Sequence, residues 1–387
     1  MKMTVLPATR EPPILHTRGD FMHHQNRRLT TLMFTAMTYA GLCQPAAAQS
    51  NITVNGTIDT YIGSMRSSGD TAQKTAVNSG GMTTSWIGFN GSEDLGGGMK
   101  ASFSLSSFLR SDTGEAGRFP GNETLWSRSA NVSLSGAFGS IALGQNLAPH
   151  FLPMILFNPF GDSYTFSPLN LHADVPLFNA SKWSSSDVGD TGWSNQILYS
   201  LPSIAGMTVN LHYQFGEVAG DSSKNNVGAN LLYAAGPLGL TAFYHKLKVN
   251  NPLNTPAGNV QPGGALPLAS GQFATSQAAW MVGVRYDFSV ATAYATFGQT
   301  SHDIDFEDST VSLGASVPMG GGKLLAAWAR TGRSGTAIGA SQSRSTVSVG
   351  YDYAVSKRTD LYAVVMNDKI THQTSGSSFG IGIRHGF

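Results

Sequence analysis

Cysteine, charge and long apolar runs are all scarce in this chain of 387 residues. A single cysteine, Cys43, excludes an intrachain disulfide framework and a cysteine-based metal site. Charged residues make up only 12% of the chain, which indicates a large surface that avoids charge. No stretch after Ala48 approaches the length of apolar sequence that a spanning helix needs, so the sequence predicts no transmembrane helix there.

The charge balance and the placement of catalytic residue types narrow the function classes. Residues 49–387 keep 19 of the 24 basic residues and 21 of the 23 acidic residues, so the segment lacks the basic footprint of a nucleic-acid-binding protein. The chain holds no HExxH motif, which argues against a zinc protease, and the histidines of 49–387 are scattered singly over different segments, which argues against a serine hydrolase. We expect no enzyme activity, no cofactor, no metal and no nucleic-acid partner.

The first 48 residues are typical of an export signal. Arg27 and Arg28 precede the short apolar run Leu29–Leu42, and small residues follow it at 46–48. Basic residues, a short apolar core and small residues at the exit are the pattern of a secretory signal peptide. Residues 1–21 do not fit that pattern, which favours Met22 as the true start. We therefore expect a signal peptide over 1–48 and a mature domain over 49–387.

Most of the mature chain alternates between apolar and polar residues. In Met207–Phe215 every odd position is apolar and every even position is polar, and Ser377–Phe387 alternates in the same way up to the terminal aromatic. Such alternation predicts strands with one apolar face, although both faces are partly apolar near 291–301, 323–331 and 359–368. Sixteen strands are expected, at 52–64, 81–90, 98–108, 124–135, 139–147, 193–200, 206–216, 226–234, 238–248, 276–287, 291–301, 309–317, 323–331, 344–353, 359–368 and 377–387.

The connections between these segments alternate between short and long. Glycine-rich turns such as 136–139 and 235–237 are short, whereas 66–80, 148–192 and 249–275 are long. Tight turns at one end and long loops at the other are typical of a transmembrane barrel, whose sheet must close so that every backbone group is paired. The fold class predicted is all-β, a transmembrane antiparallel β-barrel of 16 strands. A secreted β-solenoid or paired sandwiches would not need this alternation.

Several motifs resemble those of the general porins of Gram-negative bacteria. They are SWIGFNGSEDLGGGMKASFSL at 85–105, RSANVSLSGAFGSIALG at 128–144, GYDYAVSKRTDLY at 350–362 and the terminal GIGIRHGF. The resemblance implies a homotrimer in the outer membrane, in contact with its lipids, with the third extracellular loop folded into the lumen. It also implies that the barrel assembly machinery reads the terminal Phe387 as an assembly signal.

In this chain, 148–192 stands where that family has its constriction loop. The stretch Asn158–Asp162 resembles the turning point of the loop, so the resemblance places Asp162, Asp174 and the aromatic Phe160 near the narrowest opening. A loop of this length is uncommon without a functional role.

The wall opposite the loop departs from the family pattern. Trp86 and Gln145 occupy positions that often carry arginine. Arg285 lies on the polar face of its strand, while Arg128 shares a face with Val132 and reaches the lumen only if a bulge intervenes or the strand starts late. We take Asp162, Asp174, Arg128, Arg285, Trp86 and Phe160 as candidate constriction residues.

A barrel of 16 strands encloses an aqueous channel, whose width and lining charges set its selectivity. The expected function is passive diffusion of small hydrophilic solutes and ions across the outer membrane. Few wall arginines and acids on the loop predict weak selectivity, leaning to cations. The alternatives are a substrate-specific outer-membrane channel, or less readily an outer-membrane barrel enzyme or adhesin.

Overall fold

The computed structural model describes residues 51–118, 123–173, 191–217, 219–221, 225–248, 276–338 and 340–387. The chain divides after Ala46, and every described residue belongs to the second part. The expected signal peptide, the start at Met22 and the candidate Asp174 therefore lie outside the described residues. Among the residues described, no helix has both the length and the apolar character needed to cross a bilayer.

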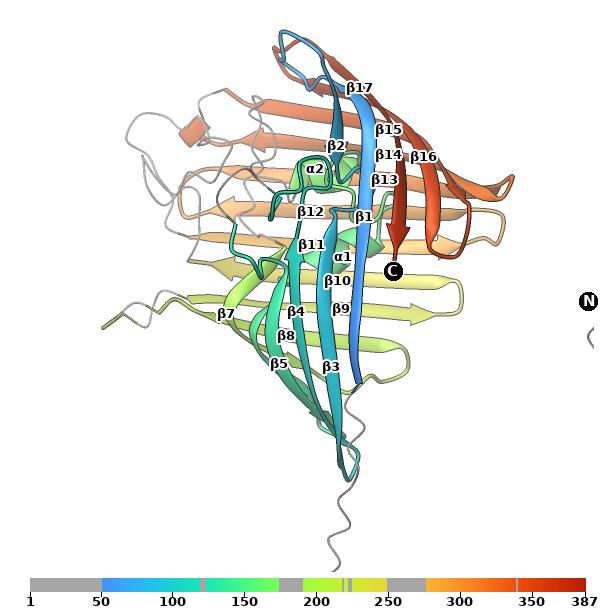
Figure 1. Ribbon diagram of the computed structural model, residues 1–387. Coiled ribbons are helices and arrows are strands. Elements are labelled where there is room, and N and C mark those ends of the chain that lie inside the picture. Colours follow the sequence, from blue (N-terminus) through green and yellow to red (C-terminus); the bar gives the residue numbers. More distant parts are fainter. Residues whose placement is uncertain are drawn as a thin grey trace, which may run out of the picture. The chain divides into compact units, whose positions relative to one another are not determined.

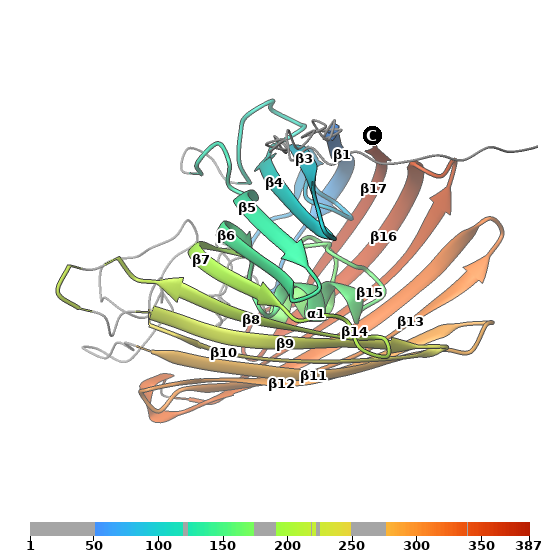
Figure 2. The same ribbon diagram turned by 90° about the horizontal axis from the view of Figure 1, so that it is seen from below.

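One antiparallel sheet of 17 strands makes up almost all of the described chain, and it closes because the first strand pairs with the last (Figures 1 and 2). The strands are β1 (Asn51–Met65), β2 (Lys74–Ser79), β3 (Trp86–Gly96), β4 (Met99–Phe108), β5 (Ser129–Gly136), β6 (Gly139–Leu147), β7 (Gly192–Ser200), β8 (Met207–Phe215), β9 (Asn225–Ala235), β10 (Leu238–Leu247), β11 (Gln277–Asp287), β12 (Thr292–His302), β13 (Glu307–Met319), β14 (Gly322–Ser334), β15 (Gln342–Ala354), β16 (Thr359–Ile370) and β17 (Gly376–Gly386).

The 17 strands correspond to 16 spans of the barrel, because β2 and β3 are two pieces of one strand. Both run antiparallel to β1: β2 pairs with Thr60–Met65, and β3 pairs with Asn51–Thr57. Counted in this way, the sheet is a closed antiparallel barrel of 16 strands, which confirms the predicted fold class.

The alternation in the sequence translates directly into outer and inner faces. In β8, Leu211 and Phe215 are exposed on the outside, whereas Asn210, His212 and Gln214 are buried toward the lumen. This arrangement is the inverse of a soluble protein, and it suits a wall whose outer face contacts lipid. Exposed aromatics such as Tyr286 and Phe288 lie near the strand ends on that outer face.

The connections are short at one end of the barrel and mostly longer at the other (Figure 2). Residues 97–98, 137–138, 236–237 and 320–321 form tight turns, while 148–191 and 248–276 join strands at the opposite end. The connection 303–306 is an exception, since it is short on the side of the long loops.

Two predicted strands need correction. The strand expected over 81–90 begins only at Trp86, because residues 80–85 leave the sheet and bond to Asp59. The strand expected from 124 begins at Ser129. The strand expected to end at 90 continues to Gly96, and β2 lies within 66–80, which was expected to be a loop. The other boundaries agree with the prediction to within about three residues.

The third long connection contains two short helices, α1 (Phe151–Leu156) and α2 (Pro168–Ala173), which lie inside the ring of strands (Figure 2). Helix α1 contacts β9 and β10, and α2 contacts β13, β14 and β15. Part of the wall beneath this loop is apolar, including Leu325 of β14 and Val364 of β16. Apolar inner faces explain why some of these strands looked apolar on both sides.

Candidate functional site

The tip of the inner loop is folded around Asn158. Its side-chain amide donates hydrogen bonds to the carbonyls of Met154 (2.8 Å) and Gly161 (2.9 Å). Its Oδ1 accepts from the backbone N–H of Phe160 (2.8 Å) and from the hydroxyl of Ser167 (3.0 Å). Gly161 takes a positive φ of 54°, a conformation that glycine adopts without strain. The tip is therefore a preformed turn rather than an extended strap.

Aromatic side chains hold this tip against the wall. Phe160 and Phe166 are almost fully buried in a cluster with Tyr61 and Tyr362 of the wall. The rings of Phe166 and Tyr61 meet edge to face with centroids 5.6 Å apart. Phe160, a candidate constriction residue, thus lies between loop and wall.

Asp162 also faces the wall. Its Oδ1 accepts a hydrogen bond of 2.8 Å from the hydroxyl of Thr83, which belongs to the segment between β2 and β3. Burial raises the pKa of the Asp162 carboxyl, and the Thr83 bond and the positive charges of Arg384 and Arg128 oppose that rise. The candidate acid of the loop is therefore partly buried and hydrogen-bonded at the junction of loop and wall.

A second carboxylate, Asp59 of β1, organises the segment that Asp162 contacts. It accepts backbone hydrogen bonds from Gly81 (3.2 Å), Met82 (2.7 Å) and Thr83 (2.8 Å), and a further one from the Tyr362 hydroxyl. Asp59 was not among the residues predicted. The one signal that could have found it is an aspartate in a strand of the apolar-polar pattern, with the glycine pair 80–81 in the next segment.

Arg128 and Trp86 meet inside the barrel. Because β5 starts only at Ser129, Arg128 is not bound by the strand alternation, and its guanidinium lies 3.8 Å from the centroid of the Trp86 ring. Its Nη1 approaches the hydroxyl of Ser106, a buried residue on the inner face of β4, at 3.4 Å. A late strand start was one of the two conditions that the sequence set for Arg128 to reach the lumen.

Arg285 occupies a separate part of the wall. It alternates with the exposed Val284 and Tyr286 of β11, so it faces inward, and its guanidinium lies 5.6 Å from the Phe157 ring of the loop. No carboxylate of the described residues forms an ion pair with Arg128 or Arg285. The other inward arginines are paired: Arg333 with Asp308, Arg344 with Asp368, and Arg384 with Asp352 and Asp360.

Helix α2 is anchored by a polar group on β14–β16. His172 lies between the hydroxyls of Thr331 (2.9 Å) and Thr346 (2.8 Å). Arg344 donates to the Leu171 carbonyl (2.8 Å) while it pairs with Asp368. Burial lowers the pKa of His172 well below its usual range, and the charge of Arg344 adds to that effect.

The start of the loop packs against a different set of residues on β7–β10. His150 lies edge to face with His245 (centroids 5.4 Å apart) and with Phe243 (5.9 Å). Trp193 lies 6.0 Å from His245 and 6.1 Å from His212. Within the described ranges no group of three or more His, Cys, Asp or Glu side chains has a geometry that could hold a metal ion.

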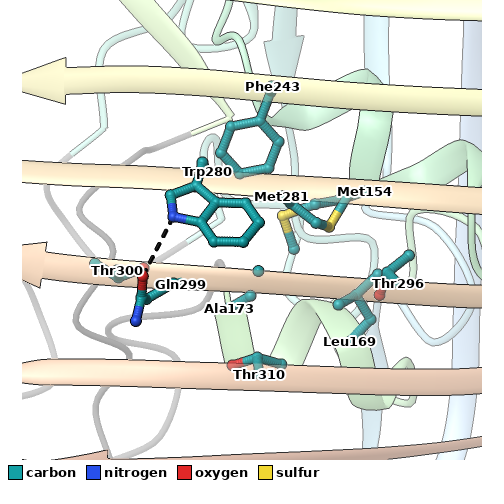
Figure 3. Close-up of a pocket in the computed structure, with 11 residues that line it drawn as sticks. Met154, Leu169, Ala173, Phe243, Trp280, Met281, Thr296, Gln299, Thr300 and Thr310 are labelled. Atoms are coloured by element: carbon teal, nitrogen blue, oxygen red, sulfur yellow. Dashed lines mark hydrogen bonds between the residues drawn. The ribbon is translucent and has the colours of Figure 1, made fainter.

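A small cavity separates the two helices from the wall at β10–β13 (Figure 3). Its volume of about 20 Å³ accommodates one water molecule and no solute. Met154, Leu169 and Phe243 line it together with Thr296, whose buried hydroxyl forms no hydrogen bond with any residue that the structure describes. The loop is therefore closely packed on this side, and the cavity is not a solute-binding site.

Comparisons with known proteins agree with this geometry. The family model for Gram-negative porins matches residues 32–373. Outer membrane porin protein 32 of Delftia acidovorans is 29% identical, with 82% of this chain and 83% of the relative covered. An outer membrane porin protein of Bordetella pertussis is 26% identical, with 92% and 99% covered.

Solved structures share the architecture. An anion-selective porin from Comamonas acidovorans superimposes with a TM-score of 0.69 at 24% identity, covering 88% of this chain and 100% of that one. The outer membrane protein OmpT of Vibrio cholerae, in a trimer form, gives a TM-score of 0.61 at 14% identity, with 87% and 99% covered. At these identities the likeness concerns the fold.

Proposed function

Because this chain belongs to the Gram-negative porin family, whose members are multi-pass proteins of the outer membrane, we propose that it is a passive diffusion channel for small hydrophilic solutes and ions. A closed barrel of this strand number leaves an aqueous path through its interior. The loop with α1 and α2 narrows that path, and solutes cross down their own concentration gradients.

We further propose that the channel is weakly selective and leans to anions. The observation that carries this proposal is the difference between the two signs of charge: Arg128 and Arg285 face the lumen without an ion pair among the described residues, whereas the Asp162 carboxylate is turned toward the wall and hydrogen-bonded to Thr83. Charges that line an opening act on passing ions, while a carboxylate that is hydrogen-bonded to the wall acts less. The cation preference expected from the sequence finds no support in the comparisons.

A homotrimer is the proposed assembly. Trimer forms exist among the structural neighbours, and the outer face carries many exposed apolar side chains that lipid or a second copy would cover. Phe387 is exposed on that face, and its backbone pairs with Gly56 of β1. We keep it as the proposed signal for the barrel assembly machinery.

Single-channel recording in a planar bilayer with a salt gradient tests these proposals. Conductance steps in groups of three, with a small reversal potential of the sign expected for anion preference, are the expected result. Folded protein that does not conduct would refute the channel, and a clear cation-selective reversal potential would refute the charge argument. The matched variants Arg128→Gln and Arg285→Gln should each reduce the anion preference, whereas Arg330→Gln, which alters an exposed residue on the outer face of β14, should leave it unchanged.

A further inference from the structure

The second wall strand of the barrel is interrupted inside the sheet. Thr60 pairs with Ser79 and Thr57 pairs with Trp86, so residues 80–85 stand opposite Ile58 and Asp59 of β1. Six residues facing two exceed the single extra residue of an ordinary β-bulge. The surplus chain is therefore a small loop within the wall.

This segment is bound on its wall side by β1 and β16. Asp59 accepts from three successive backbone N–H groups, 81 to 83, and the Tyr362 hydroxyl of β16 completes its hydrogen bonds. Gly81 is required here, because a Cβ at this position would lie 2.0 Å from the Tyr362 hydroxyl oxygen. The Asp59 carboxylate thus supplies these three N–H groups with the acceptors that a neighbouring strand would otherwise provide.

On its other side the same segment holds the tip of the inner loop. Thr83 donates to Asp162, Ser163 donates to the Gly81 carbonyl (2.7 Å), and Thr165 donates to the Gly80 carbonyl (2.7 Å). Met82 is 3% exposed and belongs to the cluster that buries Phe160 and Phe166. Three hydrogen bonds and an apolar contact therefore join the loop tip to a part of the wall that is itself outside the sheet.

We propose that residues 80–85, here named the catch, form a second element of the constriction, and that Asp59 is a positioning residue that fixes the opening by holding the catch against the loop tip. This inference rests on the proposed channel function and adds the residues that set its width. In this arrangement the loop alone does not determine the width of the opening, because the position of the loop tip depends on the position of the catch.

Asp59→Asn is the direct test. An amide offers one acceptor oxygen in place of two, so its NH₂ group faces backbone donors and the catch loses part of its attachment. We expect a rise in single-channel conductance of about 1.5-fold with increased current noise, because a released tip widens the average opening. Asp308→Asn is the matched control. Asp308 is a buried, inward carboxylate of β13 that is bonded to Arg333 of β14, and its replacement changes the lumen charge by the same amount. Equal conductance of Asp59→Asn and the wild type would overturn the proposal.

A second readout does not depend on conduction. Residues 51–387 contain no cysteine, so Met82→Cys provides a single thiol within the catch. In the otherwise wild-type barrel this thiol should react slowly with a water-soluble maleimide, and in the Asp59→Asn background at least tenfold faster. Equal labelling rates in both backgrounds would overturn the proposal even if the protein did not conduct, which separates its failure from a failure of the channel function.

Restoring the contact covalently distinguishes positioning from a general effect on folding. In the Thr83→Cys/Asp162→Cys double variant the hydrogen bond between catch and tip is lost, and conductance should rise as in Asp59→Asn. Joining the two thiols with a short bis-methanethiosulfonate reagent should return conductance to the wild-type value, and a reductant should reverse that return. An effect of Asp59 that came only from a less stable barrel would not respond to this cross-link.

Discussion

Both the tip and the root of the inner loop pack on aromatic rings, but the tip is also held by directional hydrogen bonds to the wall. The tip, residues 158–167, is joined to the catch by hydrogen bonds with defined donors and acceptors. The root, residues 148–157, rests mainly on aromatic and imidazole rings of β7–β10, including Trp193 and His245.

This difference predicts different sensitivities to substitution. A hydrogen bond depends on the identity of single atoms, so a change that preserves shape can break it. Ring packing is non-directional and depends on filled volume, so it tolerates a change of polarity better than a loss of atoms. The tip should therefore respond to isosteric substitutions and the root to truncations.

The largest effect is expected at the root from Trp193→Ala. The indole is 3% exposed and packs with Ala148 and Leu247, so its removal should cost about 3–5 kcal/mol of stability. Its N–H forms no hydrogen bond with the described residues, so Trp193→Phe should cost far less. Denaturant unfolding of the refolded barrel measures both. Similar losses for the two variants would show that polarity, and not volume, holds the root.

A smaller effect, dependent on pH, is expected at α2. The folded pKa of His172 lies well below its ordinary value of 6.5, so the unfolded chain binds a proton that the folded protein refuses. Stability from this group is complete above pH 6.5 and is lost as the pH falls below it, by about 1.4 kcal/mol per pH unit for as long as the folded imidazole stays neutral.

His172→Gln checks this sign. Glutamine is a neutral side chain that can still bond to the threonine hydroxyls, so the stability difference between variant and wild type should shift in favour of the variant as the pH falls from 7 to 4.5. A difference that stays constant with pH would show that folding does not shift the pKa of His172.

The barrel was predictable from sequence because each strand carries its own pattern. In Met207–Phe215 the lipid-facing and lumen-facing residues alternate without any need to know the neighbouring strands. Turns rich in glycine mark the ends of the segments. Sixteen spans therefore follow from local information alone.

The catch and the root were not predictable, since they depend on contacts between distant residues. The sequence 80–85 reads as the start of a strand until Asp59, 22 residues before Gly81, supplies acceptors for its N–H groups. Likewise His150, His212 and His245 come from separate segments. Only the folded chain places His212 and His245 beside Trp193, and His150 beside His245. Arg128 illustrates the same limit, because its direction depends on where β5 starts.

At the tip, Asp162→Asn should change stability by no more than about 1 kcal/mol. The amide oxygen can still accept from Thr83. A neutral side chain also avoids the desolvation of a charge, which is what raises the pKa of the carboxyl. The sign at pH 7 should be slightly stabilising, since a raised folded pKa means that the ionised form is disfavoured there. The reversal potential should move only slightly toward anions. A large shift would place the carboxylate in contact with the conducting path and contradict its assignment to the wall.

The smallest effect is expected between the two ends, in the cavity of Figure 3. Thr296 is 4% exposed and its hydroxyl forms no hydrogen bond with described residues. Desolvation of this oxygen therefore costs free energy of folding that no hydrogen bond offsets. Thr296→Val keeps the shape of the side chain and should stabilise the barrel by about 0.5–1 kcal/mol. Thr310→Val is the contrasting variant, because Thr310 lines the same cavity but bonds to Thr331 (2.7 Å) and should lose stability. If both variants lost stability in unfolding measurements, the wall beneath the middle of the loop would depend on polar interactions as the tip does. The contrast would then be confined to the root.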